Sequence, residues 1–307
     1  MAERHRAAAH AVAERALALG GATRVTAVFG DPVEHSLSPA MHNAAYAALG
    51  LDRVYAAFPV TPPMLAAAVR ALPALGILGV NLTVPHKERA VRMVAKLSAE
   101  ARVLGAINCI VNRPAGLYGD NTDARGLERD LNSLKVELAG ATAIVIGAGG
   151  GAASAVVACL QRGAGDVVIA NRTPSRAAAL GRRLRARLPR TLRGAALSVR
   201  GLDALTSPAL LERAAIVINA TPMGLTSAGF ALIDYARTQR ECFFYDLIYA
   251  AQPTAFLRPA IALGRRAADG AGMLVNQGEL AFELFNGLPP PPGVMRRALW
   301  ERLGRAF

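Results

Sequence analysis

Two segments of the chain carry polar residue types that could hold and protonate a small anionic ligand. In the first, Ser36 and Ser38 precede Pro39, and proline suits the first turn of a helix. The spacing predicts that Ser38 is the N-cap of a helix beginning at Pro39, with Ser36 on the same side. Two hydroxyls at the positive end of a helix can hold a carboxylate. The alternative is a serine that only caps the helix.

The second segment runs from Asn81 to Lys87. It leaves a predicted strand with Asn81 and Thr83 on one side, and the strand stops at Pro85. Lys87 is then expected at a helix start, where a cation is electrostatically unfavourable. A lysine kept in such a place has a reason to be functional.

Further along, Asn108 is a polar residue in an apolar setting, and Asp120 and Asp123 place two carboxylates near a predicted domain junction. A lysine and an aspartate that meet in a cleft could move a proton to or from an alcohol oxygen while a hydride moves elsewhere. The residues alone leave open which of the two aspartates would act with Lys87.

A glycine-rich turn follows the apolar run 143–146 and opens a predicted helix over 153–161. Its residues are Gly147, Ala148, Gly149, Gly150, Gly151 and Ala152. They fit the pattern G-x-G-x-x-A, in which the glycines allow a tight turn and a close approach to a pyrophosphate, and the last small residue lets the helix pack on its strand. The alternative is a tight turn that binds nothing.

The end of the next apolar run indicates which dinucleotide would bind. An NAD-selective fold places Asp or Glu there for the ribose hydroxyl, whereas this chain has Asn171, Arg172 and Thr173, with Arg176 shortly after. The two arginines could hold a 2′-phosphate, with Asn171 and Thr173 as neutral donors. This favours NADP over NAD. For the later arginines, from Arg182 to Arg193, we prefer a solvated basic face.

Short apolar runs alternate with helix-like stretches, which predicts two α/β units with mostly parallel sheets and a junction between residues 121 and 138. The predicted strands are 25–29, 54–58, 77–81, 143–146, 166–170, 215–219 and 242–246, and the helices of the first series are 39–49 and 63–72. The second series of strands is almost wholly apolar, as expected for strands covered on both faces. Residues 1–23 form a helix-prone extension, and 272–307 predict two helices separated by prolines.

Composition narrows the class of protein further. The chain has 307 residues, 53% of them hydrophobic, and a formal net charge of +13 that invites an anionic partner. Its three cysteines lie in apolar runs, so we expect buried, reduced thiols in a cytoplasmic protein. No motif suggests a metal, and no apolar stretch suggests a membrane span or a secretory signal.

In order along the chain, these motifs resemble the shikimate dehydrogenase family from Val25 to about Gly287. The matching segments are Ser36 to Pro39, Asn81 to Lys87, Gly105 to Asn108, Gly119 to Asp123, the glycine turn, Asn171 to Thr173, Asn219 to Gly224, and Asp269 to Gln277. The resemblance implies NADPH-dependent, reversible reduction of 3-dehydroshikimate to shikimate, a step of aromatic amino-acid synthesis.

The resemblance also implies a fold and a set of site residues. The N-terminal α/β substrate domain would comprise 24–122 and 270–307, a Rossmann-like NADP domain would comprise 123–269, and the active site would lie in the interdomain cleft. Lys87 and Asp123 would be catalytic. The substrate would bind Ser36, Ser38, Thr83, Asn108, Tyr249 and Gln277. Thr221, Leu247, Gly270 and Met273 would join the glycine turn and the segment from Asn171 to Arg176 around NADP.

Three positions depart from the family pattern. Ala153 stands where a basic residue is usual, Asn276 stands where histidine is common, and the usual Tyr-x-Pro-x-x-Thr stretch has its proline at Pro253. None of the three is part of the proposed proton-transfer pair.

Two other functions compete with this interpretation. A quinate or quinate/shikimate dehydrogenase would differ in substrate and cofactor; Ser38 and the arginine pair favour shikimate and NADP. A regulatory or nucleic-acid-binding module on the same fold would use the positive charge, but aromatic residues make up only 5% of the chain and do not alternate with basic ones as base stacking requires. We expect small-molecule ligands, no nucleic acid and no membrane, and a monomer or homodimer.

Overall fold

The computed structural model describes residues 19–223, 230 and 233–306. Their contacts form two compact units, the first containing 19–101, 105–122 and 278–306 and the second 102–104 and 123–277. The extension predicted for residues 1–23 lies mainly outside the described residues, and 19–23 form a turn. The main segment of the second unit begins at Asp123, the first residue of helix α5 (Asp123–Ser133).

The first unit is built on a six-stranded sheet of order β2-β1-β3-β5-β6-β4. The strands are β1 (Arg24–Gly30), β2 (Arg53–Pro59), β3 (Gly79–Leu82), β4 (Lys96–Leu97), β5 (Cys109–Arg113) and β6 (Gly116–Asp120). β1 pairs in parallel with β2 and β3, whereas β5 is antiparallel to both β3 and β6. The sequence analysis did not predict this hairpin, because Gly116, Gly119 and Asp120 interrupt the apolar pattern of β6.

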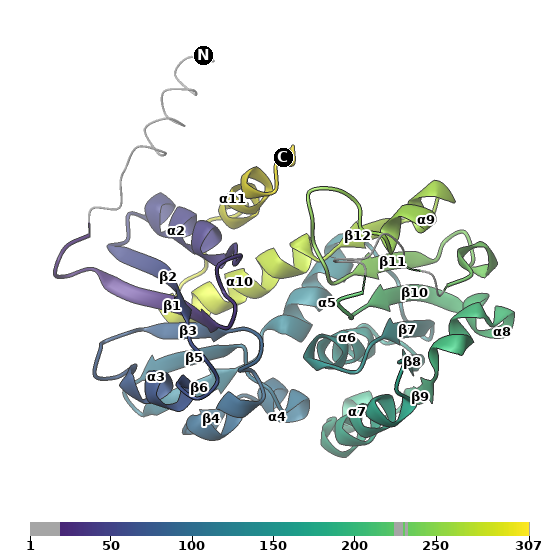
Figure 1. Ribbon diagram of the computed structural model, residues 1–307, viewed down its shortest axis with the longest axis horizontal. Helices are drawn as coiled ribbons and strands as arrows, with labels where there is room; N and C mark the ends of the chain where they lie inside the picture. Colours follow the sequence, from purple (N-terminus) through teal and green to yellow (C-terminus); the bar gives the residue numbers. More distant parts are fainter. Residues whose placement is uncertain (1–18, 224–229, 231–232, 307) are drawn as a thin grey trace, which may run out of the picture. The chain divides into compact units, whose positions relative to one another are not determined.

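Helices cover both faces of this sheet (Figure 1). They are α2 (Ser38–Leu49), α3 (Leu65–Ala71), the 3₁₀ helix η1 (Arg89–Met93), α4 (Ala99–Leu104), the part of α10 (Ala271–Asn286) from Gly278 onward, and α11 (Val294–Arg302). One apolar core joins α3 and η1 to β1 and β3. On the other face, His42 and Tyr46 of α2 contact Phe282 of α10, so α2 is held by an aromatic cluster.

The second unit has a six-stranded, fully parallel sheet of order β12-β11-β10-β7-β8-β9. Its strands are β7 (Thr142–Ile146), β8 (Asp166–Ala170), β9 (Ala196–Arg200), β10 (Ala214–Asn219), β11 (Phe243–Asp246) and β12 (Ala267–Asp269). The main helices are α5, α6 (Gly150–Gln161), α7 (Pro174–Arg187), α8 (Pro208–Leu211) and α9 (Leu257–Ala262). β8 and β9 lie on one side of β7, and the later strands β10, β11 and β12 lie on the other side. The strand order therefore reverses between β7 and β10. This is the topology of a dinucleotide-binding Rossmann fold.

Side chains of this sheet alternate between two cores. Ala143 and Val145 of β7 belong to the core that includes α5, α6 and α7, whereas Ile144 and Ile146 face the core that contains Phe244 of β11. The sequence prediction that these apolar strands are covered on both faces is confirmed. Because the strands are parallel, their carboxyl ends lie along one edge of the sheet, and polar residues can gather there.

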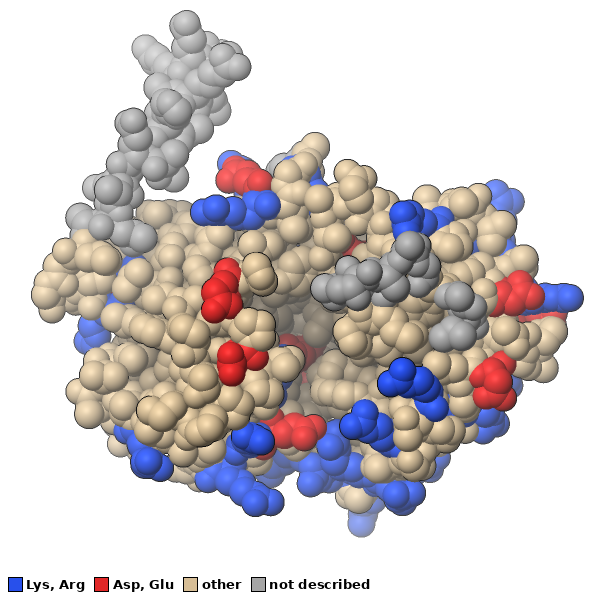
Figure 2. Space-filling view, in the orientation of Figure 1, with Lys and Arg blue, Asp and Glu red and all other residues tan. Residues whose placement is uncertain are grey.

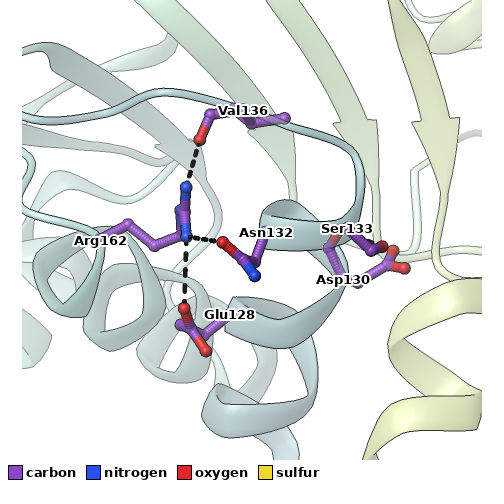
Figure 3. A network of polar contacts seen from close by, with 6 residues as sticks. All are labelled: Glu128, Asp130, Asn132, Ser133, Val136 and Arg162. Carbon is purple, nitrogen blue, oxygen red and sulfur yellow. Dashed lines mark hydrogen bonds and ion pairs between the residues drawn. The ribbon is translucent and has the colours of Figure 1, made fainter.

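Arg162, just after α6, ties that helix to α5 (Figure 3). Its guanidinium donates to Asn132 Oδ1 at 2.8 Å and to the Val136 carbonyl at 2.9 Å, and it lies 3.4 Å from Glu128 Oε1. Because α6 begins at the glycine turn, these contacts fix the helix that presents the turn.

The three cysteines, Cys109, Cys159 and Cys242, are buried and form no disulfide, as the sequence predicts. Among the helices that the structure describes, none combines the length and the apolar composition that a membrane crossing requires.

Candidate active site

Four of the residues predicted to bind substrate, Ser36, Ser38, Thr83 and Asn108, lie at one edge of the first sheet. β1 and β3 are parallel neighbours, so the segment with Ser36 and Ser38, which follows β1, and Thr83, which follows β3, leave the sheet at the same edge. A Cβ atom on Gly30 would collide with the methyl group of Thr83, whose N–H donates to the Phe29 carbonyl at 3.0 Å. Glycine at position 30 therefore leaves the space that Thr83 occupies.

The helix after β1 begins one residue earlier than predicted. Its N-cap is Leu37, whose backbone is already helical (φ −91°, ψ −3°), and Ser38 is its first residue. The prediction that Ser38 is the N-cap was wrong, because proline lacks an N–H and fits anywhere in the first turn. The Ser36 hydroxyl accepts a hydrogen bond of 3.4 Å from the Ser38 N–H, so the two serines remain adjacent at the helix start.

Lys87 lies on a turn rather than at a helix start, because residues 84–88 form turns before η1 begins at Arg89. The His86 ring nitrogen Nε2 lies 2.6 Å from the Val60 carbonyl, and the Lys87 carbonyl accepts from the Ile107 N–H at 2.9 Å. Both sides of the turn are thereby fixed to the sheet, and the Lys87 side chain is half-buried.

Asn108 connects this region to Thr122, the last residue of the first unit before Asp123. β5 is antiparallel to β3, so Asn108, just before β5, lies at the edge where β3 ends. Its carboxamide donates to Thr122 Oγ1 at 2.9 Å and accepts from the Thr122 N–H at 2.8 Å. Asp123 follows Thr122 directly and is buried. Ile107 thus bonds the Lys87 turn, and its neighbour Asn108 bonds Thr122, the residue before Asp123.

Sequence reasoning placed Asn81 beside Thr83 but gave it no role, and it missed Tyr55 altogether. The Tyr55 hydroxyl donates to Asn81 Oδ1 at 2.8 Å, and Asn81 Nδ2 donates to the Asn108 carbonyl at 3.0 Å. Burial raises the pKa of Tyr55 well above its ordinary value, so its hydroxyl keeps its proton. The sequence could have indicated a role for Asn81, because this polar residue stands two positions before Thr83, on the same side of the strand. No feature of the sequence near Tyr55 indicates its role.

In the second unit, the glycine turn lies at the carboxyl end of β7, beside the point where the strand order reverses. Gly147 has φ +125°, and a Cβ atom there would lie 2.8 Å from the Ala220 carbonyl oxygen. Around Gly149 and Gly150 a Cβ would meet nothing within 4 Å, and α6 starts at Gly150. This turn fits a pyrophosphate, because exposed backbone N–H groups and the positive end of a helix coincide at an open surface.

The residues predicted to select NADP follow β8, the neighbour of β7. Asn171 Nδ2 donates to the Thr173 carbonyl at 2.9 Å, which shapes the turn into α7. Ala148 is half-buried, and Arg172, Thr173 and Arg176 are exposed, with Arg176 in the first turn of α7. Basic side chains gather over the region of α7 (Figure 2). No carboxylate stands at the end of β8, in keeping with a site for a 2′-phosphate.

The remaining predicted cofactor residues follow the other strands of this sheet. Thr221 follows β10, Leu247 follows β11, and Gly270 and Met273 follow β12. A Cβ on Gly270 would collide with the Leu247 carbonyl, and one on Gly151 would lie 3.1 Å from Leu247 Cδ1. Leu247 thereby bridges the glycine turn and the end of β12. Gly224, part of one matched motif, lies outside the described residues.

Tyr249 and Gln277, assigned to the substrate by resemblance, belong to the second unit. Tyr249 lies just past β11, and burial raises the pKa of its hydroxyl. Gln277 lies on α10, where its Nε2 donates to the Leu274 carbonyl at 2.9 Å, and its backbone packs against Gly126 of α5.

Comparison with known proteins agrees with these features. Residues 28–110 match a family model described as the shikimate dehydrogenase substrate binding domain, 130–224 match shikimate/quinate 5-dehydrogenase, and 270–299 match the shikimate 5′-dehydrogenase C-terminal domain. A shikimate dehydrogenase (NADP⁺) of Geobacter sp. (strain M21) is 40% identical over 288 residues, covering 94% of this chain and 98% of that protein.

Two solved structures show the same fold. Shikimate 5-dehydrogenase from Thermus thermophilus, in complex with NADP(H) and shikimate, is 34% identical with a TM-score of 0.80, covering 92% of this chain and 100% of that one. Quinate dehydrogenase from Corynebacterium glutamicum, in complex with NAD, is 27% identical with a TM-score of 0.82, covering 91% and 99%. With this identity over nearly its whole length, the chain belongs to the shikimate dehydrogenase family.

Proposed function

We propose that the protein catalyses the reversible, NADPH-dependent reduction of 3-dehydroshikimate to shikimate. The observation that carries this proposal is the convergence of Ser36, Ser38, Thr83, Asn108 and the Lys87 turn on one edge of the first sheet. These residues supply hydroxyls, a carboxamide and a cation within one region, which suits a small hydroxylated acid.

In this proposal the substrate carboxylate binds Ser36 and Ser38. Ser38 lies in the first turn of α2 and Ser36 two residues before it, at the end of the helix whose partial positive charge favours an anion. Thr83 and Asn108 contact the carboxylate or the ring hydroxyls. Tyr249 and Gln277 would also contact the substrate.

The cofactor site comprises the residues at the carboxyl edge of the second sheet. When bound, NADPH supplies the hydride. The turn from Gly147 to Gly151, with Ala148 at its second position, holds the pyrophosphate through backbone N–H groups. Arg172 and Arg176 hold the 2′-phosphate, with Asn171 and Thr173 beside them. Thr221, Leu247, Gly270 and Met273 would hold the other end of the dinucleotide, and Met273 would contact the nicotinamide.

Lys87 and Asp123 perform the proton transfer. The Lys87 ammonium donates a hydrogen bond to the C3 carbonyl oxygen of 3-dehydroshikimate, stabilises the charge that develops there, and passes a proton to it. The Asp123 carboxylate orients the ammonium. Two features support the pair. The Lys87 turn and Thr122 are hydrogen-bonded to the neighbouring residues 107 and 108, and Asp123 is buried. Proton transfer by a positioned side chain contributes about 10²- to 10⁴-fold in rate.

We further infer that the protein works in the cytoplasm on small-molecule ligands, as a monomer or homodimer. Three buried cysteines that form no disulfide suit a reducing compartment. The net charge of +13 attracts the anionic cofactor and substrate.

A four-way assay tests the function. Absorbance of the reduced nicotinamide is followed with shikimate or quinate, each paired with NADP⁺ or NAD⁺. We expect the highest kcat/KM for shikimate with NADP⁺. A preference for quinate with NAD⁺ would instead assign a quinate dehydrogenase, and absence of turnover in all four mixtures would contradict the proposal.

A further inference from the structure

A single buried carboxylate at the cofactor edge of the second sheet holds two separate stretches of chain, the turn after β10 and the loop after β11. Asp246, the last residue of β11, is 0% exposed. Its Oδ1 accepts from Asn219 Nδ2 at 2.9 Å and from the Ile248 N–H at 3.1 Å, and its Oδ2 accepts from the Thr254 hydroxyl at 2.6 Å. A carboxylate is costly to bury unless hydrogen bonds satisfy it. The three donors meet that requirement.

The bond to Asn219 sets the shape of the turn after β10. Asn219 Oδ1 accepts from the Thr221 N–H at 3.1 Å and from the Thr221 hydroxyl at 2.7 Å, and Thr221 Oγ1 accepts from the Met223 N–H at 3.2 Å. The oxygen and nitrogen of a carboxamide point in different directions. Asp246 thus fixes which way the Asn219 oxygen points, and that oxygen holds Thr221.

The bond to Thr254 closes the loop 247–253. The same hydroxyl oxygen accepts from the Leu257 N–H at 3.3 Å at the start of α9. Although the proline of this loop is displaced relative to the family pattern, Thr254 keeps its place five residues after Tyr249. The contact with Asp246 gives a physical reason for that spacing, because the hydroxyl at position 254 closes the loop on the end of β11.

The two stretches held by Asp246 also contact each other and the glycine turn. The Leu247 N–H donates to the Asn219 carbonyl at 2.9 Å, and the Ala220 N–H donates to the Ile146 carbonyl at 2.8 Å. A displacement of the Asn219 side chain would therefore be transmitted to the surroundings of Gly147.

We propose that Asp246 is a positioning residue for the cofactor site, which fixes the Thr221 turn and the loop 247–253 in one arrangement before any ligand binds. Asp246 acts through Asn219, Ile248 and Thr254 and need not touch the cofactor. The inference rests on the proposed function for the identity of the ligand, but the preset arrangement of the two stretches is a property of the chain alone. A preordered site avoids the entropic cost of ordering these stretches on binding.

Two pairs of variants and one control test the proposal. Asp246→Ala removes all three acceptor contacts, whereas Asp246→Asn keeps an oxygen for Asn219 and Ile248 and a polar group for Thr254. Thr254→Val deletes one hydroxyl, whereas Thr254→Ser keeps it. Tyr235→Phe is the matched control, since the Tyr235 hydroxyl lies near Asp246 but donates its buried hydrogen bond of 2.9 Å to the Phe256 carbonyl.

The readouts are the Kd of NADP⁺ by calorimetry, KM and kcat for NADPH, and amide hydrogen exchange of segments 217–223 and 246–254 in the ligand-free protein. Asp246→Ala and Thr254→Val are expected to speed exchange in both segments and to raise Kd and KM about tenfold, with a smaller change in kcat. Asp246→Asn, Thr254→Ser and Tyr235→Phe should keep Kd within about threefold of the wild type.

Unchanged exchange and unchanged Kd in Thr254→Val, which is less disruptive than Asp246→Ala, would overturn the proposal. So would a loss of NADP⁺ affinity in Tyr235→Phe equal to that in Thr254→Val, since the effect would then be general destabilisation. A wild-type protein that binds no NADP⁺ would contradict the proposed function instead, and the exchange measurement would still decide the role of Asp246.

Discussion

Tyr55 on β2 reaches across the intervening strand β1 to place its hydroxyl 2.8 Å from Asn81 Oδ1 on β3. The Tyr55 backbone is held in turn by Asn43 of α2, which accepts from its N–H at 2.8 Å and donates to its carbonyl at 2.9 Å. The His42 ring stacks on the phenol with 4.1 Å between centroids. Tyr55, on the edge strand β2, therefore sets the orientation of the Asn81 carboxamide, two residues before Thr83.

Tyr55→Phe tests this relationship. The substitution keeps the stacked ring but leaves the buried Asn81 oxygen without its donor, which should lower the free energy of unfolding by about 1–3 kcal/mol. We expect KM for shikimate to rise and KM for NADP⁺ to stay constant, measured by steady-state kinetics. Tyr46→Phe is the control, because it removes a hydroxyl 2.8 Å from Thr26 Oγ1 on the same face. If both variants changed KM for shikimate equally, the Asn81 contact would have no special role.

His42 should make the stability of the first unit sensitive to acid. It is buried, neither ring nitrogen has a partner among the described residues, and burial lowers its pKa from 6.5 to about 3. Between these values the unfolded chain binds a proton that the folded chain does not. The stabilising contribution is thus complete above about pH 6.5 and decreases as pH falls toward 3, by up to about 1.4 kcal/mol per pH unit.

His42→Phe should flatten this dependence, since it keeps an aromatic ring on Tyr55 and removes the titrating group. Urea unfolding of both proteins between about pH 4 and pH 7 measures the effect. Parallel curves for the two proteins would show that His42 contributes nothing to the acid sensitivity.

Arg172 should determine the preference for NADPH over NADH. Replacing it with alanine removes a charge-assisted contact to the 2′-phosphate, so the ratio of the two kcat/KM values should fall by about 10-fold or more. Arg187→Ala is the matched control, because Arg187 is an exposed arginine in the last turn of the helix that follows Arg172. A ratio unaffected by Arg172→Ala would remove Arg172 from the phosphate site.

The sequence predicted the features of the fold that depend on local pattern. The apolar runs of β7, β8, β10 and β11 and the glycine turn were recognisable, because buried parallel strands and phosphate-binding turns each have a distinctive composition. The β5–β6 hairpin was not, because its glycines and Asp120 break the apolar periodicity. The start of α2 was placed one residue late, since proline is tolerated at more than one position of a first turn.

The contacts that order the site were beyond local pattern. Tyr55 and Asn81 meet only because of the register between β2, β1 and β3, and Asp246 and Asn219 meet because β10 and β11 are paired in the same register. Such contacts depend on which strands become neighbours. The residues expected to touch ligands were therefore visible in the sequence, whereas the residues that hold them in place became visible only in the fold.

The most direct test of the account is the turnover of Lys87→Ala with shikimate and NADP⁺, measured together with its NADP⁺ affinity. If Lys87 transfers the proton, kcat should fall by about 10²-fold or more while the Kd for NADP⁺ stays near that of the wild type. Turnover within about threefold of the wild type, with NADP⁺ binding intact, would contradict the role of Lys87 and with it the proposed mechanism.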